Sequence, residues 1–147
     1  MKSLIVLSVL FAVANCMDVK FRSCAKDPNP TKITAVSIEP CTEEPCVLHR
    51  GATSTIAIKF TPTADVDSLT TVVKGKIGPL WVPFPLDQPD ACKGSVTCPL
   101  KAGQEYTYKF SLPVKPAYPQ LSVVVSWELK DKNGKDVVCV MFPTKLE

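Results

Sequence analysis

Apolar and polar residues alternate along several stretches of this chain, and this period of two constrains the fold more than any other feature. Residues 106–114 read YTYKFSLPV, so the larger apolar side chains share one face, while Thr107, Lys109 and Ser111 share the other. Such alternation is typical of a strand with one buried face, and no stretch shows a convincing helical period. The same pattern predicts strands at 121–130 and 55–60, and more weakly at 33–38, 69–77 and 137–142.

A turn signal connects two of these expected strands. Asn133 and Gly134 have the residue types of a tight hairpin turn in which both central residues take positive backbone angles, so strands 121–130 and 136–142 are expected to pair. Six or seven short antiparallel strands, each apolar on one side, bury those sides by packing two sheets together. The sequence therefore predicts an all-β chain folded as an immunoglobulin-like β-sandwich in one domain.

The first residues, MKSLIVLSVLFAVANC, resemble a secretory signal. Lys2 precedes an apolar run from Leu4 to Ala14, which is shorter than the roughly 20 residues that a membrane-spanning helix needs. We expect residues 1–16 to be cleaved after Cys16, which leaves residues 17–147 as the mature domain and predicts a secreted, extracellular protein. The Asn29-Pro30-Thr31 stretch is blocked as a glycosylation site by its proline, so no N-glycan is expected.

Six cysteines follow the expected signal segment: Cys24, Cys41, Cys46, Cys92, Cys98 and Cys139. An even number of cysteines in a small secreted domain indicates disulfides, and six of them allow fifteen pairings. Cys41 and Cys46, like Cys92 and Cys98, are near neighbours across proline-containing turns, which leaves Cys24 to pair with Cys139 and tie the two ends of the domain together.

The stretch GPLWVPFP, residues 78–85, holds large apolar side chains among three prolines. Because proline cannot donate to a sheet ladder, we expect this stretch to be a loop. An exposed loop carrying Trp81 and Phe84 is unusual in a soluble protein, which predicts that these side chains cover something apolar. Periodicity does not decide whether the inner faces of the two sheets form a packed core or a ligand pocket, because both use the same residue types.

The residue types argue against a metal site, an enzyme and a nucleic-acid-binding protein. His49 is the only histidine and the cysteines are assigned to disulfides, so no metal site and no cofactor are expected. No serine lies in a nucleophile-elbow pattern, which argues against an enzyme. The net charge is +3 with dispersed lysines, which argues against nucleic-acid binding and favours an ordinary solvated surface over attraction to anionic membranes.

The order of several motifs resembles a known family. These motifs are EPCTEEPCVLHRG (39–51), WVPFP (81–85), DACKGSVTCPLKAGQEYTY (90–108), LPVKPAYP (112–119) and VVVSWEL (123–129), with Cys24 before them and Cys139 after them. Together they resemble the Niemann-Pick type C2 proteins of the ML lipid-recognition domain family, to which the group 2 mite allergens also belong. The CVLHRG stretch is similar to the arthropod branch of that family.

This resemblance implies a two-sheet sandwich with the three disulfides paired as above and an apolar tunnel that holds one lipid between the sheets. The tunnel mouth in the sterol-carrying members matches Phe84, Val114 and Tyr118 here, with Trp81 on the same proline-rich stretch. The positions that resemble deeper lining are Val82, Pro119, Trp127, Val73, Ile38 and Ile56. Val140 stands where those members have tryptophan, which predicts a pocket of different shape.

The function that follows is a non-enzymatic, monomeric carrier of a sterol or long-chain fatty acid, in transient contact with a membrane or a receptor. An alternative is an innate-immunity or chemosensory module that recognises lipid within a receptor complex. A small secreted hydrolase relying on His49 is a third reading. The missing glycosylation site favours an extracellular location over the lysosomal lumen.

Overall fold

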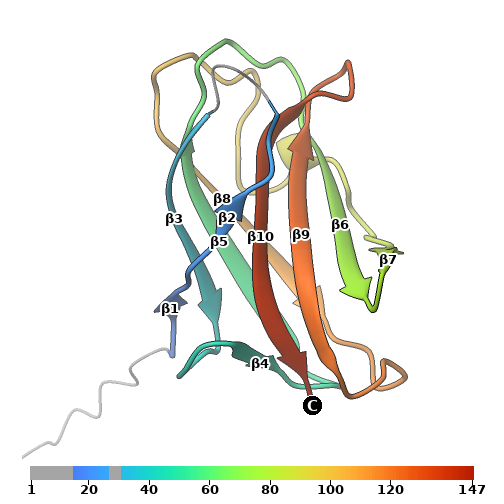
Figure 1. Cartoon of the computed structure of the whole chain (residues 1–147). Coiled ribbons are helices and arrows are strands. Elements are labelled where there is room, and N and C mark those ends of the chain that lie inside the picture. The colour runs from blue at the N-terminus through green and yellow to red at the C-terminus, as the bar shows by residue number, and fades with distance from the viewer. Residues whose placement is uncertain (1–14, 27–30) are drawn as a thin grey trace, which may run out of the picture.

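The computed structural model describes residues 15–26 and 31–147, which fold into two β-sheets packed face to face (Figure 1). The first sheet has the strand order β1-β3-β5-β8 and contains β1 (Met17–Asp18), β3 (Lys32–Glu39), β5 (Thr53–Thr61) and β8 (Tyr106–Pro113). The second has the order β2-β10-β9-β6-β7 and contains β2 (Arg22–Ser23), β10 (Asp136–Leu146), β9 (Ser122–Lys130), β6 (Thr70–Ile77) and β7 (Leu80–Phe84). The expected all-β sandwich of two antiparallel sheets is confirmed.

Two short elements complete the described chain. Strand β4 (Cys46–Leu48) joins β10 in parallel, whereas the other strand pairs of the described residues are antiparallel. A single 3₁₀ turn spans Ala91–Lys93, capped by the Asp90 carboxylate, which accepts a hydrogen bond from the Cys92 N–H. No helix in the described ranges has the length and apolar character to cross a membrane. The expected signal segment lies almost entirely outside the described residues.

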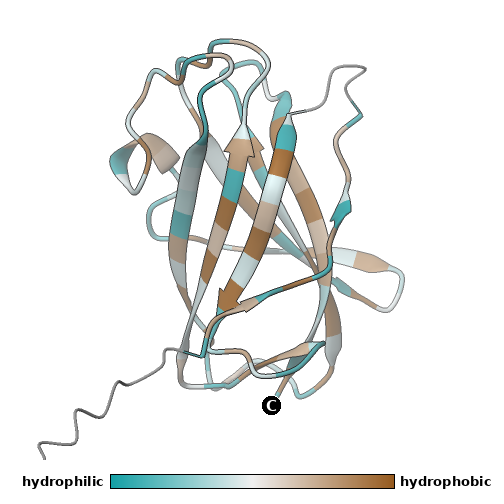
Figure 2. Ribbon diagram, turned by 90° about the vertical axis from the view of Figure 1, so that its left-hand side faces the viewer, coloured by the Kyte–Doolittle hydropathy of each residue, from teal (hydrophilic) through white to brown (hydrophobic). Residues whose placement is uncertain are grey.

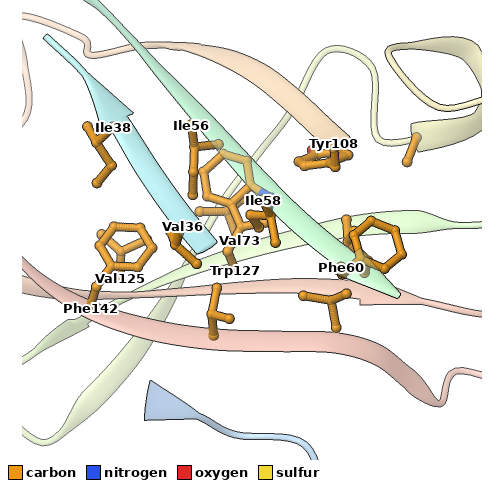
Figure 3. Packing of buried hydrophobic residues seen from close by; sticks show 14 of the residues in the cluster. Val36, Ile38, Ile56, Ile58, Phe60, Val73, Tyr108, Val125, Trp127 and Phe142 are labelled. Carbon is orange, nitrogen blue, oxygen red and sulfur yellow. The ribbon is translucent and has the colours of Figure 1, made fainter. Parts of the chain in front are cut away.

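Buried and less buried side chains alternate along the strands, as the sequence pattern predicted. In β9 the side chains of Val123, Val125, Trp127 and Leu129 are buried between the sheets. The ribbon coloured by hydropathy shows the same banding along the strands (Figure 2). The core centres on Trp127, which makes an edge-to-face contact with Tyr108 at a ring-centroid distance of 6.3 Å (Figure 3). It makes a second such contact with Phe110 at 5.7 Å. Aromatic pairs in this arrangement add to the stabilisation from burial.

The expected hairpin between β9 and β10 forms, but its turn differs from the prediction. Gly134 has a positive φ of 76°, but no non-glycine residue in the described chain has a positive φ. The prediction of a positive φ at Asn133 was therefore wrong. The Asp131 carboxylate organises the turn instead, since it accepts hydrogen bonds from the N–H groups of Asn133 and Lys135. A register shift between Asp136 and Val138 then absorbs the longer connection.

The prediction of a loop at residues 78–85 was also wrong, because Leu80–Phe84 form strand β7, which pairs with β6. Gly78, with a φ of 59°, and Pro79 make the turn between the two strands. Strand β7 lies at the edge of its sheet, so one of its sides has no neighbouring strand. A proline, which lacks a backbone N–H group, is tolerated in such an edge strand. Pro83 is therefore compatible with the strand.

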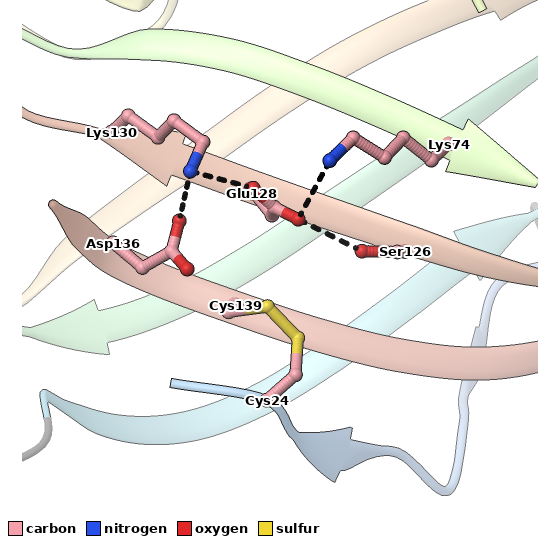
Figure 4. The surroundings of a disulfide bond; sticks show 7 residues. All are labelled: Cys24, Lys74, Ser126, Glu128, Lys130, Asp136 and Cys139. Carbon is pink, nitrogen blue, oxygen red and sulfur yellow. Dashed lines mark hydrogen bonds and ion pairs between the residues drawn. A yellow bond between two sulfur atoms is a disulfide. The ribbon is translucent and has the colours of Figure 1, made fainter. Parts of the chain in front are cut away.

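The three disulfides pair as predicted: Cys24 with Cys139, Cys41 with Cys46, and Cys92 with Cys98. The first fastens the N-terminal segment to the outer face of β10, where the Cys24 N–H also donates to the Cys139 carbonyl at 2.9 Å. Figure 4 shows a group of charged side chains beside this bond. The second sheet is thus held at one edge by covalent and hydrogen bonds together.

Glu128 is the centre of that charged group. Its carboxylate lies 3.0 Å from the Lys130 ammonium and 3.8 Å from the Lys74 ammonium, and Lys130 also reaches the Asp136 carboxylate at 3.1 Å (Figure 4). Burial would raise the pKa of Glu128, but the hydrogen bond and the charge of Lys130, with help from Lys74, lower it overall. Burial raises the pKa of Asp136, and the neighbouring Glu128 charge acts in the same direction.

Replacing Glu128 with glutamine should therefore reduce the free energy of unfolding at neutral pH by about 1.5–3 kcal/mol, the range for a hydrogen bond to a charged group. A carboxyl whose pKa is lower in the folded state stabilises the fold above its unfolded-state pKa. The difference between wild type and E128Q should be complete above the ordinary value of 4.5 and shrink as the pH falls below it. Urea unfolding at several pH values measures this, and a difference that grows towards low pH would contradict it.

Candidate functional site

Two aromatic side chains, one from the second sheet and one from the connection between the two sheets, meet at one end of the space between the sheets. Phe84 ends β7 in the second sheet, and Tyr118 lies on the connection that follows β8 in the first. Their ring centroids are 5.4 Å apart with the planes at 69°, an edge-to-face contact. Val114 is buried beside them, and all three line one small cavity. The structure thus brings together the three residues that were predicted for the tunnel mouth.

Gly75 makes room for the Phe84 ring. It lies within β6, where glycine weakens a strand because it adds backbone freedom and buries no side chain. A β-carbon at this position would lie 2.5 Å from Cε2 of Phe84 and 2.9 Å from Cγ1 of Val123. The ring therefore packs directly on the backbone of β6, and only glycine allows it to lie so deep.

Arg50 fixes the connection that carries Tyr118. Its guanidinium donates to the carbonyl oxygens of Pro116 and Tyr118 at 3.5 and 3.2 Å. Below this contact the Gly51 N–H donates to the Val114 carbonyl, and the Val114 N–H donates to the Ala52 carbonyl. The connection that carries Tyr118 is thus fixed to the turn before β5, so the Tyr118 ring faces Phe84 from an ordered backbone.

Two small apolar cavities lie between the sheets. One, of about 20 Å³, is beneath the mouth and is lined in part by Val73, Phe84, Val114 and Tyr118. The other, of about 30 Å³, lies deeper and is lined in part by Ile38, Ile56, Trp127 and Phe142. Leu48, Leu112 and Val125 line both cavities, so they form the partition between them.

Seven of the predicted residues thus line one cavity or the other, and three do not. Val82 is 38% exposed, Pro119 is exposed, and neither lines either cavity. Trp81 is 42% exposed and pairs with Lys76 in the register of β7 and β6, which places it on the outer face of the sheet. Sequence reasoning missed the partition residues, although Leu112 and Val125 are on the predicted inner faces of their strands.

The interior chemistry is almost entirely apolar. No acidic or basic side chain lines either cavity in the described part of the chain. The Tyr108 hydroxyl is buried within hydrogen-bond distance of the Thr71 hydroxyl, 2.9 Å away, and burial raises the pKa of Tyr108. The Thr144 hydroxyl donates to the Val123 carbonyl at 2.9 Å. These hydroxyl groups are satisfied, whereas the buried Nε1 of Trp127, a residue of the deeper cavity wall, has no hydrogen-bond partner among the described residues.

The other reactive side chains lie outside this interior. His49 is exposed and lines a separate polar pocket together with Glu43 and Glu147. Glu128, Asp136 and Cys139 have potential ligand atoms within 4.8 Å of one another, but the Cys139 sulfur is bonded to Cys24 and offers no thiolate. Among the described residues, neither histidine nor an acidic side chain lines either interior cavity.

Comparison with known proteins identifies the fold. Residues 18–146 match the family model of the ML domain. The chain belongs to the ML domain family. Among curated ML relatives, it is 44% identical to the "Ecdysteroid-regulated 16 kDa protein" of Manduca sexta over 86% of this chain and 87% of that one. It is 37% identical to the "NPC intracellular cholesterol transporter 2" of Danio rerio, with 96% of this chain and 94% of that one covered.

A solved ML domain structure is similar throughout. The crystal structure of a Niemann-Pick type C2 protein from the Japanese carpenter ant has a TM-score of 0.80 and 33% sequence identity, and the match covers 88% of this chain and all of that one. The resemblance to Niemann-Pick type C2 proteins, predicted from the order of the motifs, is confirmed.

Proposed function

We propose that this protein is a carrier that binds one hydrophobic molecule, a sterol or a long-chain fatty acid, between its two sheets. The observation that carries the proposal is the pair of apolar cavities behind the mouth formed by Phe84, Val114 and Tyr118. A zebrafish relative named as a cholesterol transporter supports a sterol as one class of cargo. No step of the proposed function requires a bond to be made or broken, so the protein acts without catalysis.

Binding by this route requires the interior to expand. Pockets that enclose small molecules usually have volumes of about 300–1,000 Å³, far above those of the two cavities. Leu48, Leu112 and Val125 separate the cavities, so a guest that displaces these side chains joins both spaces into one tunnel. Each ligand methylene taken out of water contributes about 0.8 kcal/mol, which offsets the cost of parting the packed walls.

An apolar lining of this kind imposes little selectivity on the body of the guest. Dispersion and burial stabilise any apolar molecule of suitable length and width. The polar end of the guest is therefore selected by the groups around Phe84 and Tyr118. There the Arg50 guanidinium and the backbone of the connection that carries Tyr118 are the polar groups near the two rings. The proposed setting is an extracellular fluid, where a monomer releases its guest during transient contact with a membrane or a receptor.

Replacing Phe84 with alanine tests the proposal. The change removes the ring that covers the outer cavity, and we expect affinity for a fluorescent sterol or fatty-acid probe to fall about tenfold, or about 1.4 kcal/mol. F84L, which keeps an apolar side chain over the same cavity, should retain most of the affinity. Unfolding curves of both variants check that the fold persists.

Native mass spectrometry of the secreted wild-type protein provides the direct measurement. One bound lipid per chain, identified after extraction, would establish the cargo class. Unchanged probe affinity in a folded F84A protein would remove Phe84 from the site. Failure of wild type to take up either probe would contradict the carrier function itself.

A further inference from the structure

The outer face of the second sheet carries an apolar strip where a solvated face should be polar. Among the outward positions of β9, Ser122 is exposed and Lys130 is partly exposed, and Ser126 is polar but buried. Near the end of β9 next to the β6–β7 turn, however, Val124 points outward, and its register partner on β10 is Pro143. Met141 lies in the next outward row of β10 and is only partly exposed. Val124, Met141 and Pro143 form the floor of a groove.

Two walls give this outer groove its depth. On one side Trp81 of β7 lies next to Lys76 of β6, whose ammonium lies 5.9 Å from the centre of the indole ring, within cation–π range. On the other side are Phe21 and Arg22, where β2 crosses beside β10 (Figure 1). The groove is open to solvent and has a volume of about 520 Å³, larger than either interior cavity and within the range of small-molecule pockets.

The charges around the outer groove have one sign. Lys20, Arg22 and Lys76 line it, and no acidic side chain of the described residues does. The carboxylate of Glu44 accepts a hydrogen bond from the Lys20 N–H, so the positive potential is least compensated at Arg22 and Lys76. Glu128, farther along the same face, is already paired with Lys130 and Lys74. A guest in this groove meets hydrocarbon below it and cations on both walls.

We propose that the outer groove is a second binding site, separate from the interior, for a single amphiphilic anion such as a long-chain carboxylate. The acyl chain lies on Val124, Met141 and the Trp81 ring, and the acid group lies between Lys76 and Arg22. The interior cavities have no cationic lining, so an anionic head group is better matched by the outer groove than by the interior. This site does not depend on the proposed carrier function.

The two tryptophans of the chain report on the two sites separately. Trp81 is 42% exposed and forms a wall of the outer groove, whereas Trp127 is 2% exposed and lines the deeper interior cavity. A W127F protein therefore emits from the groove, and a W81F protein emits from the interior. A bromine-labelled dodecanoic acid, used below its micelle-forming concentration, quenches only the tryptophan that it contacts.

We expect this acid to quench Trp81 in the W127F protein saturably, with one molecule bound per chain. Adding K76A to this protein should weaken the binding about tenfold, and raising the salt concentration should weaken it further. The matched control K59A removes an exposed lysine from β5, in the other sheet, and should leave the binding unchanged. The bromine-labelled dodecanol, which has no charge, should quench Trp81 far less.

Equal quenching of Trp81 by the acid and the alcohol would overturn the proposal, as would unchanged binding in K76A. Quenching that occurs only when the acid is presented in phospholipid vesicles would show a membrane-contact surface in place of a site for a single molecule. Quenching of Trp127 in the W81F protein measures the interior independently, so the carrier function and the outer groove can fail separately.

Discussion

Replacing Cys24 and Cys139 together with alanine is expected to lower the free energy of unfolding by about 5 kcal/mol, which is comparable to the whole stability of many small domains. The bond joins residues 115 positions apart, so its loss releases a long loop of unfolded chain. The Cys92–Cys98 bond spans only 6 positions, and on the same chain-entropy argument its removal should cost about 2 kcal/mol. Urea unfolding of the two double variants, at matched pH, compares them.

The folded structure adds to this expected difference. Strand β2 pairs with β10 at only two positions, and the Cys24–Cys139 bond lies directly beside that short pairing. Without the bond, little else on the sheet edge would retain the N-terminal segment that carries Phe21 and Arg22. Equal losses in the two double variants would mean that loop length does not determine the stabilisation. In that case the local packing of each bond would have to explain it.

The strands were predictable because burial on one face imposes a local pattern. In β8 and β9 the residues expected to face inward are the ones that do so, and the sandwich follows from pairing such faces. Strand β7 was missed because the compatibility of Pro83 with a strand depends on whether that strand lies at a sheet edge, and this is decided by tertiary structure. The extra residues in the turn at Gly134 depend in the same way on the side chain of Asp131.

The candidate site was predictable in part. Phe84, Val114 and Tyr118 were named from the family resemblance, but the contact between the rings joins β7 to the connection after β8 and has no local signature. Leu112 and Val125 were expected on inner faces, and periodicity does not distinguish a core residue from a cavity wall. A signal for Trp81 was available, because two residues three apart in an extended segment face opposite sides. With Phe84 facing inward, Trp81 had to face outward.

Replacing Gly75 with alanine should disturb both stability and lipid binding, because the new methyl group occupies space that the Phe84 ring now fills. A β-carbon at this position would lie 2.5 Å from Cε2 of Phe84, too close for any real contact, so the ring must turn away from β6. Overpacking of this kind usually costs about 1–3 kcal/mol. We expect the free energy of unfolding to fall by about 2 kcal/mol and the affinity for a sterol or fatty-acid probe to fall with it.

A second substitution separates the displaced ring from other effects of the new methyl group. In the double variant G75A/F84L the shorter side chain no longer reaches the methyl group, so a large part of both losses should be recovered. Recovery should stay incomplete, because Cγ1 of Val123 also lies 2.9 Å from the new β-carbon. A double-mutant cycle from urea unfolding and probe titration measures the coupling between Gly75 and Phe84. Additive losses would mean that the methyl group acts through β6 or Val123, and Gly75 would then have no part in positioning the ring at the mouth.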